Sequence, residues 1–188
     1  MTDHPAGSPR ISRDPISSDV IYKGQIFDVR IDEIQMGESR HKREVVVHKG
    51  SAVIIPVFEN NTVALVRQFR QPAGKSLLEI PAGSLDGDES PETGAARELE
   101  EEIGVKAHKI EKLSEFWVSP GFLTEKMHLF LATQLTNVGQ NLDNDEDLEI
   151  ERYSFSELFE MLSRGEIEDA KTVIAIYQSA DRLGIQHN

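Results

Sequence analysis

The chain has 188 residues, a net charge of −13 and no cysteine, with 38 % apolar and 28 % charged residues. The length and this ordinary globular balance predict one folded domain, with room for an appendage, rather than a disordered chain. The acidic balance disfavours nonspecific binding to nucleic acid or to an anionic membrane. The absence of cysteine excludes disulfides, a cysteine nucleophile and a zinc–thiolate site.

The N-terminal segment reads as a loose arm. Proline, serine and charged residues dominate residues 1–19, which lack the apolar core of a signal peptide. No stretch of the chain approaches the roughly 20 apolar residues that a membrane span needs. We therefore expect a flexible arm over residues 1–19 and a cytoplasmic protein.

Strands are predicted first and helices mostly late. Ser90 followed by Pro91 is a helix-start signal, and Gly104 is a natural stop. Two amphipathic helices are expected over residues 156–165 and 169–184. This mixture predicts an α/β protein in which helices flank a mixed sheet. β-Branched residues alternate or cluster in the predicted strands, which cover residues 19–36, 40–58, 62–72, 76–81, 126–135 and 150–155.

Glutamates crowd the end of the first predicted helix. At about 100° per residue, Glu98, Glu101 and Glu102 share an arc of about 100° beside the apolar stripe that faces the sheet. Glu100 falls on the other flank of that stripe. The stripe consists of Ala95, Leu99 and Ile103.

Convergent carboxylates repel one another unless cations neutralise them. Hard divalent ions such as Mg²⁺ prefer oxygen ligands, and the glycine-containing turn "PAG" just before this helix lets backbone carbonyls approach an ion. The alternative is a solvated acidic helix face. Helix geometry alone leaves both interpretations open.

The spacing of these residues resembles the Nudix box. Gly83, Glu89 and "RELEEEIGV" over residues 97–105 occupy every fixed position of that motif. The resemblance implies a Nudix fold, an α/β/α sandwich with a mixed β-sheet and an N-terminal β extension. It also implies hydrolysis of a nucleoside diphosphate linked to another group, with Mg²⁺ or possible substitution by Mn²⁺.

The resemblance also implies roles for single residues. Arg97 and Glu89 stand where the family braces the box, and Arg97 counts among the catalytic residues. Glu100 stands at a position that the family leaves free. The family's metal ligands correspond to Glu98, Glu101 and Glu102, and in the sugar-nucleotide branch also to the carbonyl of Ala82.

A second resemblance concerns the substrate. Pro120 stands sixteen residues after Gly104, an offset similar to that of ADP-ribose pyrophosphatases, although Pro120–Gly121 also suits an ordinary turn. This branch implies a nucleoside diphosphate sugar substrate, with AMP and ribose 5-phosphate released from ADP-ribose. It further implies a homodimer that exchanges N-terminal strands, here residues 20–48, ahead of a Nudix domain over residues 49–188.

Substrate contacts in this branch correspond to Arg43, Arg70, Pro120 and Glu125. The planar fork of arginine suits bidentate bonds to phosphate, so Arg43 and Arg70 are expected to meet the nucleotide or pyrophosphate. Arg67 competes with Arg70, and each arginine could instead form a surface ion pair. Glu125 is expected near the terminal ribose, although a solvated loop carboxylate would look the same.

A general base is expected from the acidic loop over residues 144–149. A free carboxylate there would take a proton from the attacking water. Glu146 is our prediction, with Asp145 and Glu149 as rivals. Glu101 of the box remains an alternative base.

Three functions compete at this point. The first is an ADP-ribose or sugar-nucleotide pyrophosphatase, and the second is a Nudix enzyme for GDP-mannose or an oxidised nucleoside triphosphate. The third is a noncatalytic nucleotide-sensing regulator on the same fold. The intact glutamate trio argues against the regulator, and Pro120 with the N-terminal strands favours the first function.

Overall fold

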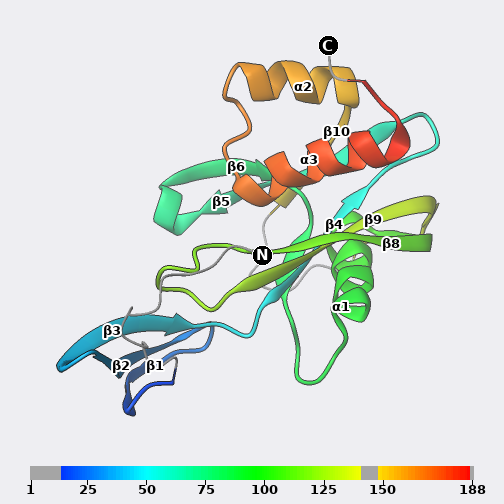
Figure 1. Cartoon of the computed structure of the whole chain (residues 1–188). Coiled ribbons are helices and arrows are strands. Elements are labelled where there is room, and N and C mark those ends of the chain that lie inside the picture. Colours follow the sequence, from blue (N-terminus) through cyan, green and yellow to red (C-terminus); the bar gives the residue numbers. More distant parts are fainter. Residues whose placement is uncertain (1–13, 141–147, 187–188) are drawn as a thin grey trace, which may run out of the picture. The chain divides into compact units, whose positions relative to one another are not determined.

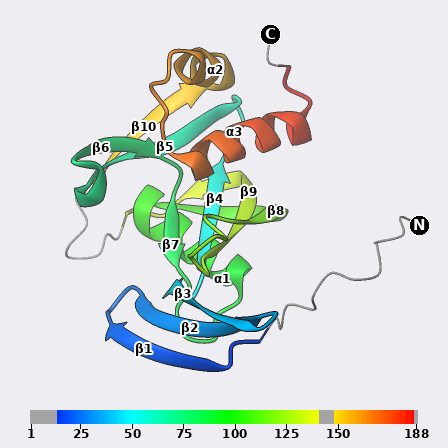
Figure 2. The same ribbon diagram turned by 60° about the vertical axis from the view of Figure 1, so that its left-hand side comes forward.

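The structure, a computed structural model, describes residues 14–140 and 148–186. The chain divides into two compact units (Figures 1 and 2). The N-terminal unit contains residues 14–49 together with Trp117–Glu125, and the box unit contains Gly50–Phe116 and the chain after Glu125. Most of the predicted arm lies outside the described residues.

The N-terminal unit is an antiparallel three-stranded sheet of order β1-β2-β3. Its first strand begins at Ser17, inside the predicted arm, because backbone pairing with β2 orders the chain from there. The segment Trp117–Glu125 attaches to the last strand: Val46 N donates to Phe122 O at 2.7 Å, and Thr124 N donates to Val46 O at 2.9 Å. The strands are β1 (Ser17–Lys23), β2 (Asp28–Met36) and β3 (Ser39–Val47).

The box unit contains two sheets. A four-stranded sheet has the order β7-β4-β9-β8, with β4 antiparallel to β7 and parallel to β9, so it is mixed. A three-stranded antiparallel sheet has the order β10-β5-β6. The strands are β4 (Ser51–Pro56), β5 (Thr62–Arg70), β6 (Lys75–Glu79), β7 (Ala82–Ser84), β8 (Val105–Trp117), β9 (Lys126–Asn137) and β10 (Leu148–Ser154).

Helices cover both faces of the four-stranded sheet (Figure 1). On β4, Ala52 and Ile54 pack with the box helix, whereas Val53 and Ile55 pack in the cluster that holds Ala175 and Ile176 of α3. This alternation gives the three layers of an α/β/α sandwich and confirms the predicted fold class. The helices are α1 (Pro91–Glu98), its π-helical continuation η2 (Leu99–Ile103), α2 (Phe155–Ser163) and α3 (Ala170–Leu183), with a 3₁₀ turn η1 (Gln71–Ala73).

Two further features differ from the sequence-based expectation. Strand β8 was not expected at all, and the predicted acidic loop over residues 144–149 ends earlier, because Leu148 already belongs to β10. Within the described ranges, none of the helices combines the length and apolar character needed to cross a membrane.

Candidate active site

The box helix begins and ends as its sequence predicts, but its winding changes midway. The Ser90 hydroxyl oxygen accepts a hydrogen bond from Thr93 N at 3.1 Å, and Pro91 is the first helical residue. Gly104 closes the helix with a φ of +71°, a conformation that glycine adopts without strain. From Leu99 to Ile103 the chain winds as a π-helix, a form often found at functional sites.

The glutamates of this helix differ in burial. Glu98 and Glu102 are only 7 % and 3 % exposed, whereas Glu101 is half-buried and Glu100 lies 4.0 Å from Lys106 across an ion pair. Burying a carboxylate is costly unless positive charge or hydrogen bonds compensate it. The two buried carboxylates therefore require cationic partners, whereas Glu100 does not.

Arg97 binds three box carboxylates at once. Its Nη1 donates to Glu98 Oε1 at 2.7 Å and to Glu101 Oε2 at 2.9 Å, and its Nη2 donates to Glu89 Oε1 at 2.9 Å. The hydrogen bond that Arg97 donates to Glu89, the charge of Glu98, and the hydrogen bonds donated to Glu101 and Glu98 raise the pKa of the Arg97 guanidinium against the effect of burial. The same contact lowers the pKa of the Glu89 carboxyl, which also accepts a hydrogen bond from Asp86 N. Arg97 and Glu89 thus tie the helix to the preceding loop.

Gly83 forms a cradle for the carboxylate of Glu98. A Cβ atom at Gly83 would lie 1.7 Å from Glu98 Oε1 and 2.2 Å from its Cδ, so no larger residue fits without displacing that side chain. Strand β7 fixes this approach by pairing Gly83 with Ala52 and Ala82 with Val53 of β4. The backbone at Gly83, next to Ala82, therefore lies beside the Glu98 carboxylate.

The donor set fits a hard divalent ion. The Glu98 carboxylate, which lies against Gly83, and the backbone carbonyls of β7 are oxygen donors, the ligand type that Mg²⁺ and Mn²⁺ prefer. Over residues 14–140 and 148–186, no three acidic or histidine side chains already form a ligand cluster. Arg97 instead engages Glu98 and Glu101.

Arg67 and Arg70 point to opposite faces of their sheet. Side chains alternate along a strand, and Arg67 pairs in register with Leu78, whereas Val66 pairs with Glu79. Leu78 belongs to the core cluster of α3 and Val66 to that of the box helix. Arg70 is four residues after Val66 on the same strand, so its side chain lies on the same face of the sheet, toward the box helix. Arg67 lies on the other face, where it forms an ion pair with Glu151.

Arg70 is held by a carboxylate that sequence reasoning missed. Its Nε donates to Glu79 Oε1 at 2.8 Å and its Nη2 to Glu79 Oε2 at 2.9 Å. The hydrogen bonds of Glu79, and more weakly the charge of Glu102, raise the pKa of the Arg70 guanidinium. Arg70 therefore lies within the electrostatic reach of the box. The signal in the sequence was one acidic residue inside the apolar run "SLLEIP".

Three predicted substrate residues belong to the N-terminal unit. Arg43 lies exposed on β3, where its Nη1 donates to Lys42 O at 3.1 Å, and no described carboxylate forms an ion pair with it. Pro120 is exposed in the segment Trp117–Glu125. Glu125 is more buried than a solvated loop carboxylate, with Oε1 3.9 Å from His48 Nδ1.

The predicted base is only partly described. Asp145 and Glu146 lie outside the described residues. Their rival Glu149 pairs in register with Arg67 on β10, next to Leu148, which packs with the box helix. Because neighbouring side chains alternate, Glu149 points away from the box, which argues against it as the base.

Known proteins resemble this chain along most of its length. The family model for the NUDIX domain matches residues 48–175. An ADP-ribose pyrophosphatase from Bacillus subtilis is 36 % identical over 164 residues, which cover 86 % of this chain and 89 % of that protein. A GDP-mannose pyrophosphatase from Escherichia coli is 38 % identical over 148 residues, which cover 73 % and 76 % of the two chains.

A solved structure shares the fold. The crystal structure of an ADP compounds hydrolase superposes with a TM-score of 0.81 at 20 % identity, and the match covers 97 % of each chain. Nudix hydrolases generally use divalent metal ions, in agreement with the oxygen donors around Gly83. The box, the fold and the family model agree, and this chain belongs to the Nudix family of pyrophosphate-cleaving hydrolases.

Proposed function

We propose that this protein hydrolyses the pyrophosphate bond of ADP-ribose, and of related nucleoside diphosphate sugars, in the cytoplasm. ADP-ribose would give AMP and ribose 5-phosphate. The observation that carries the proposal is the complete box, in which Glu98 and Glu102 are buried carboxylates and Glu98 lies directly against Gly83. The similarity to an ADP-ribose pyrophosphatase over most of both chains supports this substrate.

The metal site would be built from Glu98, Glu101, Glu102 and the carbonyl of Ala82, with Mg²⁺ as the ion and Mn²⁺ as a substitute. When bound, such an ion neutralises the pyrophosphate and lowers the pKa of a water molecule. Arg97 orients the first two carboxylates through its bonds to both. Its own charge limits their repulsion while the site is forming.

Two arginines and two further side chains would recognise the substrate. Arg70, with its guanidinium plane fixed by Glu79, would bind the pyrophosphate by bidentate hydrogen bonds. Arg43 would supply a second cation. Among the described residues no carboxylate forms an ion pair with it, so its charge is available to the substrate. Pro120 and Glu125 would shape and contact the site of the terminal ribose.

The proton of the attacking water would pass to a carboxylate outside the metal ligands. Glu146 is the proposed base, with Asp145 as its rival, and both lie outside the described residues. Glu101 is the alternative within the box. A carboxylate already bound to metal is a poor proton acceptor, which favours Glu146.

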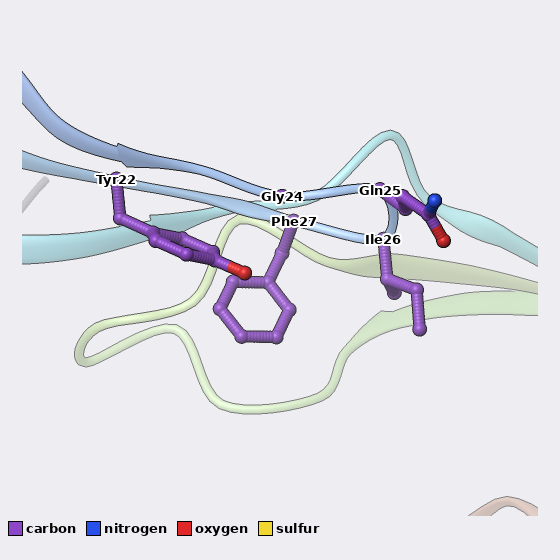
Figure 3. Close-up of a pocket in the computed structure, with 5 residues that line it drawn as sticks. All are labelled: Tyr22, Gly24, Gln25, Ile26 and Phe27. Carbon is purple, nitrogen blue, oxygen red and sulfur yellow. The ribbon is translucent and has the colours of Figure 1, made fainter.

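A homodimer formed by exchange of the N-terminal strands is the proposed assembly. The first strand and the turn after it expose an apolar surface, which typically marks an interaction site. Figure 3 shows that Tyr22 and Phe27 face each other there, with ring centroids 6.0 Å apart. The exposed large apolar residues of this unit are Ile16, Val20, Ile21, Tyr22, Ile26, Phe27, Trp117, Val118 and Phe122.

A substrate panel tests the proposed activity. The purified protein with Mg²⁺ is assayed against ADP-ribose, GDP-mannose, other sugar nucleotides and oxidised nucleoside triphosphates, and the products are separated by chromatography. We expect the highest kcat/KM for ADP-ribose, with AMP and ribose 5-phosphate as products. GDP-mannose is the second candidate substrate, because an Escherichia coli relative is a GDP-mannose pyrophosphatase. A preference for GDP-mannose would overturn the substrate assignment. Binding without any hydrolysis would point to the regulator.

A further inference from the structure

Four charged side chains meet where β5, β6 and the start of α3 come together. Glu79 of β6 is 2 % exposed, and the side chain of Lys171 from α3 is 8 % exposed. Arg70 at the end of β5 is the outermost member, with its side chain 40 % exposed. Asp169 completes the cluster at the N-terminus of α3.

The cluster ties α3 to the strand that precedes the box. Lys171 Nζ forms an ion pair with Glu79 and lies 3.1 Å from Asp169 Oδ1. Asp169 caps the helix, accepting a hydrogen bond from Thr172 N at 3.0 Å. The Thr172 hydroxyl in turn accepts a hydrogen bond from Ile80 N at 2.9 Å. Residues of α3 therefore hold Glu79 in place independently of Arg70.

The charge balance of the cluster keeps Glu79 ionised. Burial alone would raise the pKa of the Glu79 carboxyl, but the hydrogen bonds of Arg70 and the charge and hydrogen bond of Lys171 outweigh burial and lower it. Lys171 supplies the buried counterion. Arg70 is therefore the one cation of this cluster that also reaches solvent.

The orientation of Arg70 follows from this arrangement. Glu79 takes the edge of the guanidinium formed by Nε and Nη2, and a bidentate bond of this kind fixes the plane of the group. Along the described chain, no other side chain bonds to that guanidinium. The edge that includes Nη1 remains open for a ligand.

We infer that Glu79, anchored by Lys171, is a positioning residue that aims the open edge of Arg70 at the pyrophosphate. This inference rests on the proposed function, in which Arg70 binds that group. Glu79 itself does not touch substrate and acts only through Arg70. Loss of its charge would leave Arg70 present but free to rotate.

A double-mutant cycle separates this role from a merely structural one. Hydrolysis of ADP-ribose, or of the best pyrophosphate substrate of the panel, is measured for Glu79→Gln, Arg70→Ala and the double variant. We expect a loss in kcat/KM of about 100-fold for Arg70→Ala and of about 10-fold or more for Glu79→Gln. The double variant should be no worse than Arg70→Ala alone, because the two residues act as one. The loss should fall on the same parameter, kcat or KM, in both single variants.

A matched control comes from the other face of the same three-stranded sheet. Glu151→Gln breaks the Arg67–Glu151 ion pair of β5 and β10 and should leave kcat/KM unchanged. An equal loss in this control would trace the effect to the sheet as a whole and overturn the inference. Additive losses in the cycle, or unchanged kcat/KM in Glu79→Gln, would overturn it as well.

Folding is checked in parallel by circular dichroism and by Tm. Should Glu79→Gln fail to fold, Glu79→Asp replaces it in the cycle, since it keeps the charge but draws the carboxylate back from Arg70. A wild-type protein that cleaves nothing in the panel refutes the proposed function. An active wild-type protein with an additive cycle refutes only the positioning role.

Discussion

Gly83 and Glu98 approach so closely that a single methyl group on Gly83 would lie 1.7 Å from the carboxylate. Gly83→Ala must therefore push the Glu98 side chain out of its place. We expect the Mg²⁺ concentration at half-maximal activity to rise about 10- to 100-fold, as when a metal site loses a supporting contact. Activity titrated with Mg²⁺ measures this, with circular dichroism as the check on folding. An unchanged half-saturation would mean that Glu98 is not a ligand.

The burial of Glu102 predicts a large kinetic effect. Glu102→Gln removes a charge from the proposed metal site while keeping the shape of the side chain. Loss of a residue that only supports a metal ligand costs roughly 10- to 100-fold. We expect the loss of a ligand itself to lower kcat by more than this, with the fold intact. Glu100→Gln is the control from the same helix, because Lys106, at 4.0 Å, is the one ion-pair partner of Glu100 among the described residues. Near-normal turnover of Glu102→Gln at saturating Mg²⁺ would contradict the assignment.

The proposed base should be separable from the metal ligands. Glu146→Gln is expected to lower kcat strongly while leaving the affinity for Mg²⁺ almost unchanged, whereas Glu102→Gln should alter both. Turnover and Mg²⁺ titration calorimetry on the two variants measure the difference. Wild-type kcat in Glu146→Gln with loss in Asp145→Asn would move the role to Asp145. Activity in both variants would move it to Glu101.

The exposed apolar side chains of the N-terminal unit predict association. We expect sedimentation equilibrium to show a homodimer, because the apolar residues Tyr22 and Ile26 are 55 % and 70 % exposed in the single chain. Replacing both with serine should weaken the dimer and lower activity together. A wild-type monomer that is fully active at the concentrations of the assay would count decisively against the exchange of strands.

Acid should destabilise the protein partly through Glu79. Its carboxyl has a lowered pKa in the folded state, so its stabilisation is complete above the unfolded pKa of about 4.3 and is lost as the pH falls through the folded value. Glu79→Gln should reduce the free energy of unfolding by about 1–3 kcal/mol at pH 7. Urea unfolding should show that the difference in the free energy of unfolding between the wild type and Glu79→Gln narrows below about pH 4. A gap that stays constant into acid would show that Glu79 is not ionised in the folded protein.

Much of the site could be predicted from the sequence, because the box is local. Ser90, Gly104 and the glutamates between them lie in one helix, so their spacing fixes their geometry. The π-helical turn could not be predicted, since an α-helical wheel assumes the same rotation per residue along the whole helix. Strand β8 was missed because its apolar residues recur mostly every third position among Lys and Glu, a pattern unlike the alternation of an ordinary strand.

Contacts between distant segments were not predictable from a local pattern. Arg67 and Arg70 looked equivalent in the sequence, and only the register of β5 with β6 separated their faces. Lys171 lies 92 residues from Glu79 along the chain, so the local sequence of neither segment predicts the ion pair between them.

The attachment of Trp117–Glu125 to β3 limits how this enzyme could be shortened. The chain passes from one unit to the other at Lys49–Gly50, at Phe116–Trp117 and again at Glu125–Lys126. Cutting off everything before Gly50 would therefore strip Phe122 and Thr124 of the backbone partner that Val46 gives them. An evolutionary or engineered loss of the first strands would have to rebuild this middle segment at the same time, so the two units should be inherited together.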